Sequence, residues 1–152
     1  MRLSKNFVLS EITRSNTAKR LNISNAPDKE HLRNMQRLIT NLIQPIRDSL
    51  GPIRITSGYR SPQLNRAIGG SRKSQHCKGE ALDLQFWKDG QMCNQEIYDW
   101  VLKQEIEFDQ MINEFDYAWI HISLKEKDNR KMVLEAYHDD DGDTKYKYAD
   151  LT

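Results

Sequence analysis

Apolar side chains recur at helical intervals between Asp28 and Leu50, the clearest pattern in the chain. The face that they define consists of Leu32, Met35, Leu38, Ile39, Leu42, Ile43 and Ile46. Asp28 stands near the start of this pattern and Gly51-Pro52 stops it, as expected at the two ends of a helix. Pro45 lacks an amide hydrogen and crowds the preceding turn, which predicts a kink in the last turns.

Shorter helices are predicted on both sides of this segment. Residues 10–21 predict an amino-terminal helix with Ser10 as its N-cap, and residues 62–68 predict a second short helix. Residues 94–106 carry Ile97, Val101 and Leu102 at helical spacing and predict a third.

Stretches rich in β-branched or alternating apolar residues predict strands at 53–56, 81–86, 108–113, 117–124 and 131–137. In the second of these stretches, alternation places Asp83 on the face opposite Leu82 and Leu84. Asp83 can therefore point into a cleft while the two leucines enter a core.

The acidic run at 139–143 contains an Asp-Gly pair and predicts a turn that joins the last strand to residues 145–148. A calcium-binding EF-hand would need an acid at position 137 and a glutamate at position 148, and both are tyrosine. The elements together predict an α+β fold in a single domain over residues 1–152. We expect a small antiparallel sheet with helices packed against it, and a terminal hairpin or tail over about 131–152.

Charge and composition exclude several classes of protein. The 23 basic and 22 acidic side chains leave a net charge of +1, which gives no general argument for binding nucleic acid or an anionic membrane. No stretch approaches the roughly 20 apolar residues of a membrane span, and the amino terminus lacks the apolar core of a secretory signal. We expect a protein that is cytoplasmic on synthesis, with no stable membrane insertion and no nucleic-acid partner, and we expect a monomer.

Two histidines and a carboxylate, His76, Asp83 and His121, form a candidate metal site. Imidazole nitrogen and carboxylate oxygen both suit Zn²⁺, and a catalytic zinc typically keeps three protein ligands with an open fourth position. Gly79 lies between the first two residues, where a turn could bring His76 back beside Asp83. Cys77 is an alternative ligand as a thiolate, although Cys77 and Cys93 are expected to be free thiols.

The pattern Ser-x-His-x-x-Gly-x-Ala-x-Asp over residues 74–83, with Trp-Ile-His at 119–121, resembles the M15 peptidases. These are zinc D-Ala-D-Ala carboxypeptidases and peptidoglycan endopeptidases. Residues 55–65 are similar to the Ser-Gly-Tyr-Arg-Ser segment of that family, and residues 6–18 resemble the opening of small phage and prophage members. The resemblance implies one Zn²⁺ ion held by His76, Asp83 and His121, in a cleft at the sheet.

The resemblance also implies a function and further site residues. It implies hydrolysis of peptide bonds next to D-residues in peptidoglycan stem peptides, with action at the cell wall after release by lysis or another route, as in an endolysin. Arg60 is assigned to substrate binding, since its planar guanidinium suits a carboxylate or a developing oxyanion, and Ser74 is a second candidate.

The resemblance does not identify the residue that acts as general acid and base. Members of the family commonly carry an acid three residues before the last histidine, and position 118 is alanine here. Glu114 is the preferred candidate and Asp116 the second, since a carboxylate must take a proton from the attacking water and deliver one to the leaving amine.

Two alternatives stay open at this point. The chain could be a non-catalytic zinc-containing module that binds the cell wall or a protein, which Ala118 favours. Zinc could instead serve folding alone, with Cys77 as a fourth protein ligand.

Overall fold

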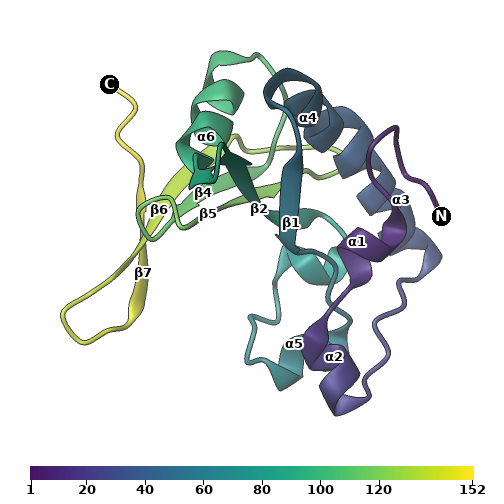
Figure 1. The fold of residues 1–152 in the computed structure, drawn as a ribbon. Coiled ribbons are helices and arrows are strands. Elements are labelled where there is room, and N and C mark those ends of the chain that lie inside the picture. The colour runs from purple at the N-terminus through teal and green to yellow at the C-terminus, as the bar shows by residue number, and fades with distance from the viewer.

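A sheet of seven strands runs through the computed structural model, which describes residues 1–152 (Figure 1). The strands are β1 (Ile53–Ser57), β2 (Ala81–Lys88), β3 (Gln91–Met92), β4 (Gln110–Glu114), β5 (Trp119–Ser123), β6 (Met132–His138) and β7 (Thr144–Tyr148). Their order is β1-β2-β5-β4-β6-β7, and β3 pairs with β2.

The helical elements surround this sheet. They are α1 (Leu9–Thr13), α2 (Asn16–Leu21), α3 (Lys29–Leu38), the π turn η1 (Ile39–Ile43), α4 (Gln44–Leu50), α5 (Pro62–Ala67), the 3₁₀ turn η2 (Gln75–Lys78) and α6 (Asn94–Lys103). The predicted α+β class, with helices packed against one sheet, is confirmed.

The prediction of a purely antiparallel sheet is wrong at one pair of strands. β4 and β6 run parallel, with Gln110 aligned to Met132 and Glu114 to Ala136. The reason is that β4 lies between β5 and β6, and that residues 124–131 lead from the end of β5 past the beginning of β4. β6 therefore starts at the same edge as β4. Alternation identifies each strand separately and carries no information on such a pairing.

The long helix predicted over 28–50 is continuous but not uniform. Asp28 caps it by accepting a backbone hydrogen bond of 2.8 Å in the first turn. α3 passes into η1, where the Gln44 amide donates to the carbonyl of Ile39, five residues back, and α4 follows. Pro45 has no amide hydrogen and its ring crowds the preceding turn, so the predicted irregularity takes the form of a wide turn just before it.

The amino-terminal prediction needs two corrections. Two helices, α1 and α2, take the place of one, and Ser10 lies inside α1, whose N-cap position is Val8. Ser15 is the capping serine, because its backbone is extended and its hydroxyl accepts from the Ala18 amide at 3.1 Å at the start of α2.

Two tight turns join consecutive antiparallel strands, β2 to β3 and β6 to β7. Asp89 and Gly90, with φ of 52° and 76°, connect β2 to β3, a strand that the sequence pattern does not predict. The β6–β7 hairpin forms where the acidic run predicts it, and Asp139 Oδ1 accepts from the amides of Asp141 and Asp143 at 3.0 Å and 2.9 Å. The run therefore builds the turn.

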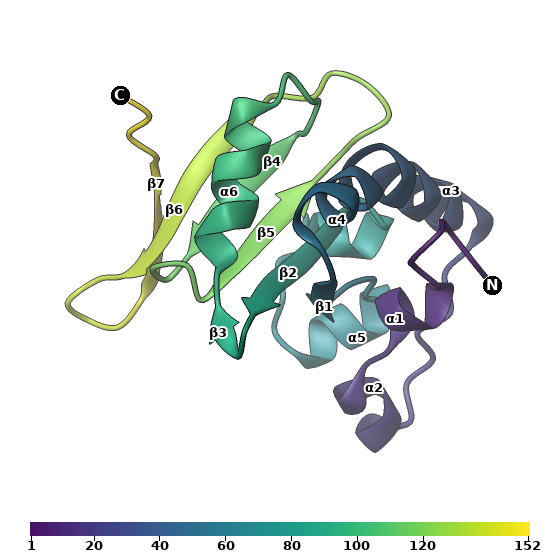
Figure 2. The same ribbon diagram turned by 45° about the horizontal axis from the view of Figure 1, so that its top comes forward.

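α4 and α6 cover one face of the sheet, and the opposite face carries the candidate site residues. α4 contacts β1, α6 contacts β2 and β5, and Figure 2 shows both helices on the same side. Side chains buried on that side include Leu82, Leu84, Met111, Ile120 and Ile122. The opposite face carries Asp83, His121 and Glu114, as alternation along the strands requires. None of the helices combines the length and apolar character needed to cross a membrane.

Candidate metal centre

Three elements that are distant in the sequence bring His76, Asp83 and His121 together. His76 lies on η2, Asp83 on β2 and His121 on β5, and the last two are direct partners in the antiparallel pair. Directly opposed residues project from the same face of a sheet. One nitrogen or oxygen atom of each side chain lies within 4.8 Å of those of the other two.

The short turn η2 is held by polar contacts on every side of His76. Ser74 Oγ accepts from the His76 amide at 3.3 Å, and Gly79 ends the turn with a φ of 74°. The Arg60 amide donates to the His76 carbonyl at 3.1 Å, and His76 Nδ1 donates to the Gly58 carbonyl at 2.7 Å. The last bond fixes the ring and leaves Nε2 free to bind a metal.

Asp83 lies between the two imidazoles. Its Oδ1 is 3.4 Å from His76 Nε2 and 3.0 Å from His121 Nδ1. Burial lowers the pKa of His76, which keeps this imidazole neutral. Burial would raise the pKa of Asp83, but the hydrogen bond from His121 and the proximity of His76 outweigh it and hold that pKa well below its usual range. A neutral imidazole and an ionised carboxylate are the forms that bind metal ions.

This donor set fits the zinc ion that the motif implies. Two imidazoles and one carboxylate are common zinc ligands, and three protein ligands leave one position open. Cys77 does not belong to the group of converging ligand atoms and is a half-buried free thiol. The chain therefore does not close the site with a fourth ligand from Cys77, which argues against a purely structural metal.

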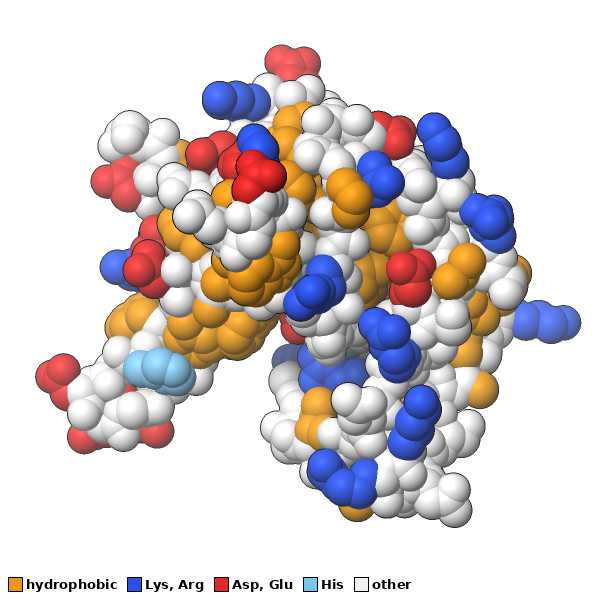
Figure 3. All heavy atoms as spheres, in the orientation of Figure 1, with side chains coloured by type: hydrophobic (Ala, Val, Ile, Leu, Met, Phe, Trp, Pro, Cys, Tyr) orange, Lys and Arg blue, Asp and Glu red, His pale blue; other side chains and the backbone are white.

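The metal-ligand group opens into a cleft of about 770 Å³. Its walls come from the β1–α5 connection and the loop that follows α5 on one side, and from β4, β6 and β7 on the other. Figure 3 shows the molecule hollowed between the β6–β7 hairpin and the lobe that holds α2 and α5. His76, Asp83 and His121 all line this cleft.

Glu114 lines this cleft and does not belong to the metal group; Glu80 and Asp109 are the other two carboxylates of which this is true. Glu114 ends β4 and is only 8% exposed. Burial raises the pKa of its carboxyl to about 7. A carboxyl group with such a pKa can both accept and donate a proton near neutral pH.

Asp116 lies elsewhere, exposed in the turn between β4 and β5, and does not line the cleft. Phe115, Asp116 and Tyr117 are all left-handed, with φ of 51°, 55° and 63°. Strand alternation does not continue through such a turn, and Asp116 is not among the cleft residues although Glu114, two positions earlier, is. Of the two candidate acids, the structure brings Glu114 to the cleft.

Arg60 and Ser74 both line the cleft beside the metal group. Arg60 Nη1 donates to Asn65 Oδ1 at 3.1 Å, whereas its buried Nε has no hydrogen-bond partner. Asn65 uses only part of the donor capacity of the guanidinium, so Arg60 keeps hydrogen-bonding capacity for a ligand. Ser74 Oγ already accepts from the loop that carries His76, and its hydroxyl hydrogen stays available.

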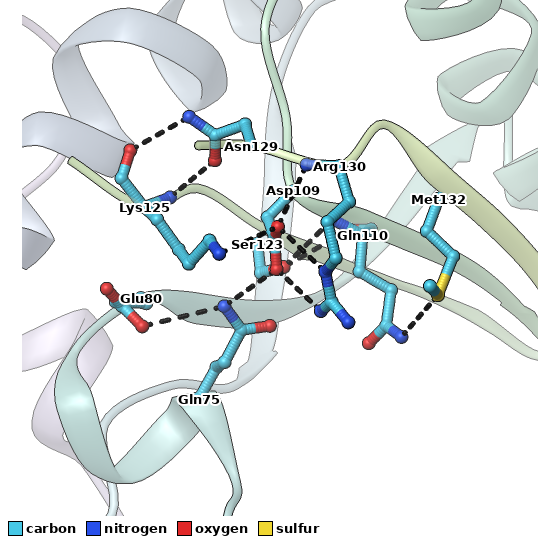
Figure 4. A network of polar contacts seen from close by, with 9 residues as sticks. All are labelled: Gln75, Glu80, Asp109, Gln110, Ser123, Lys125, Asn129, Arg130 and Met132. Atoms are coloured by element: carbon cyan, nitrogen blue, oxygen red, sulfur yellow. Dashed lines mark hydrogen bonds and ion pairs between the residues drawn. The ribbon is translucent and has the colours of Figure 1, made fainter. Parts of the chain in front are cut away.

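Asp109 is a buried carboxylate that the sequence patterns do not single out. It connects η2, the turn that carries His76, to the sheet (Figure 4). Its Oδ2 accepts from Gln75 Nε2 at 3.1 Å and from Arg130 Nη2 at 2.8 Å. Its Oδ1 accepts from the amide and the Nε of Arg130 at 3.1 Å, and Lys125 Nζ lies 3.5 Å away. Gln75 directly precedes His76, so this network steadies η2. The cationic side chains on a polar loop were the only hint of it in the sequence.

A sequence model of the family described as Peptidase M15 matches residues 5–123, which include all three candidate metal ligands and Glu114. No curated protein matches the chain.

Proposed function

The chain belongs to the M15 peptidase family, and on this premise we propose that it is a zinc-dependent peptidase that cleaves peptidoglycan stem peptides. The bond is one next to a D-residue, cleaved by a D,D-carboxypeptidase or an endopeptidase of the endolysin kind. The observation that carries the proposal is the convergence of His76, Asp83 and His121 within 4.8 Å at a cleft that also holds Glu114.

Each residue of the cleft has a role in this proposal. When bound by His76, Asp83 and His121, zinc supplies Lewis-acid polarisation of the peptide carbonyl and lowers the pKa of a water. Glu114 takes a proton from the attacking water and returns one to the leaving amine, a task that suits a pKa of about 7. Arg60 binds a carboxylate or the developing oxyanion of the substrate through guanidinium donors that Asn65 does not use.

The charge of the cleft supports an anionic peptide as the substrate. Basic side chains that line it are Arg60, Lys73, Lys78, Lys125 and Arg130. Two of the acidic lining residues are already neutralised, since Asp83 faces the metal position and Asp109 is paired with Arg130. Cationic clefts attract anionic ligands, and stem peptides carry free carboxylates.

The test is release of D-alanine or of new amino groups from purified peptidoglycan by the zinc-loaded protein. A chelated sample and His121→Ala are the controls. Zinc-dependent release supports the proposal, and the products separate a carboxypeptidase from an endopeptidase. Zinc binding without release from several wall types would instead indicate the non-catalytic binding module that Ala118 favours.

A further inference from the structure

The β6–β7 hairpin lies beyond residues 5–123, the part of the chain that the family model matches, yet it lines the same cleft. Leu134 on β6 and Thr144 and Tyr146 on β7 are lining residues. In Figure 1 the hairpin projects from the edge of the sheet, and Figure 3 shows it as one border of the hollow. This wall of the cleft therefore comes from a segment outside the matched region.

Strand register places Tyr146 in line with the candidate acid. Glu114 on β4 is the partner of Ala136 on β6, and Ala136 is the partner of Tyr146 on β7. Residues in register across neighbouring strands project from the same face. Two strand spacings separate the backbones of Glu114 and Tyr146 by about 10 Å. Ala136 between them is buried and small, so it leaves room for the tyrosine ring to reach over it.

We infer that Tyr146 is a substrate-binding residue whose phenol hydroxyl donates a hydrogen bond to a carbonyl oxygen of the bound peptide. The peptide lies between Tyr146 and the opposite wall, which holds Arg60 and Ser74. The inference rests on the proposed function, because it takes a peptide as the ligand of this cleft.

Exposure and chemistry agree with this role. Tyr146 is 55% exposed and lines the cleft, so the residue is accessible to a ligand there. Burial raises the pKa of its phenol, and the negative charges of Glu114 and Asp83 raise it further. The hydroxyl therefore stays protonated and can donate at neutral pH.

Tyr148 provides a matched control on the same strand. It projects from the same face, opposite Leu134, but it is 74% exposed and does not line the cleft. Tyr148→Phe removes the same hydroxyl from the same hairpin, without touching the proposed peptide site.

The experiment compares the wild-type protein with Tyr146→Phe and Tyr148→Phe, using a synthetic stem pentapeptide. Steady-state kinetics are measured on the zinc-loaded proteins, and peptide Kd is measured by calorimetry with each tyrosine change placed in a Glu114→Gln background. For Tyr146→Phe we expect KM and Kd to rise about five- to tenfold with kcat little changed, as for loss of one hydrogen bond made equally in ground and transition states. Tyr148→Phe should leave all three values unchanged.

Unchanged KM and Kd in Tyr146→Phe, or equal changes in both variants, would overturn the assignment. A fall in kcat alone would also overturn it, since that result moves the hydroxyl from binding to chemistry. Failure of the proposed function is a separate result, because a wild-type protein that hydrolyses nothing still yields the calorimetric comparison. A protein that does not bind the peptide at all refutes the inference together with the proposal.

Discussion

At the scale of single residues, two carboxylates in one cleft are prepared for different tasks. Asp83 is held ionised by the hydrogen bond from His121 and the proximity of His76, whereas burial raises the pKa of Glu114 to about 7. Pairs of acids whose environments push their pKa values apart are typical of sites that need one ionised group and one proton carrier. The difference supports the proposed roles of Asp83 in metal binding and of Glu114 in proton transfer.

Glu114→Gln should retain zinc and lose most turnover, since the amide keeps the shape of the side chain but cannot exchange a proton. Loss of a general acid/base typically lowers kcat by a factor of about 10² to 10⁴. Metal content by atomic emission and peptide release by mass spectrometry measure the two effects separately. Asp116→Asn is the matched control, because this exposed carboxylate lies outside the cleft and should be dispensable. Full activity in Glu114→Gln would remove Glu114 from the mechanism.

At the scale of elements, the site depends on how η2 is attached to the rest of the chain. The turn is closed by Gly79 at one end and connected through Gln75 to the buried Asp109. Neither contact touches the metal position directly. Both determine where His76 lies, so their loss should affect stability and metal affinity together.

Gly79→Ala should destabilise the protein by roughly 2–4 kcal/mol, because the left-handed backbone disfavours a side chain and the new Cβ would also collide with the backbone carbonyl of His31. Gly90 is the control, since its φ of 76° matches the 74° of Gly79 while nothing lies within 4 Å of a Cβ there. Gly90→Ala should cost only about 1–2 kcal/mol, the conformational part. Urea unfolding measures both values, and equal losses would show that the close packing of η2 against α3 contributes nothing.

Asp109 should make folding stability sensitive to acid. Burial alone would raise its pKa, but hydrogen bonds from Arg130 outweigh this and lower the pKa from 3.8 to about 2. A carboxylate with a depressed pKa contributes stability that is fully present above pH 3.8 and is lost as the pH falls through about 2. The contribution is about 2 kcal/mol.

Asp109→Asn tests this value in urea unfolding across that pH range. The free energy of unfolding of the variant should lie below that of the wild-type protein at pH 6, by about 2–3 kcal/mol. The gap should narrow between pH 4 and pH 2, since Asp109 of the wild-type protein is protonated in the unfolded chain at a higher pH than in the folded one. A gap that stays constant with pH would contradict the ionic role of Asp109.

At the scale of the whole molecule, local patterns predict the elements better than their pairing. The periodic apolar face at 32–46 and the cap at Asp28 locate the long helix, because both act within a few turns. The parallel pairing of β4 with β6 depends on which strand lies between two others, and no local pattern encodes it. For the same reason the sequence did not predict Tyr146 as a site residue. Tyr146 is in register with Glu114 only because both are strand partners of Ala136.

The candidate site shows the same division. His76, Asp83 and His121 could be predicted because their residue types and spacing follow a motif. Asp109 could not, since its partner Arg130 is 21 residues away and a single acid within a predicted strand has many uses. The contacts that support a site depend on the tertiary fold. The metal ligands themselves must be of a few residue types, so a sequence motif can identify them.

Zinc should stabilise the entire domain, because the three ligands come from η2, β2 and β5 and converge only in the folded chain. At a free zinc concentration 100-fold above Kd, binding adds about 2.7 kcal/mol, which corresponds to a rise in Tm of roughly 5–10 °C for a domain of this size. Scanning calorimetry with zinc and with a chelator measures the shift. His121→Ala should show almost none, since only two ligands remain. An equal shift in this variant would place the stabilising ion elsewhere and would separate metal binding from the cleft.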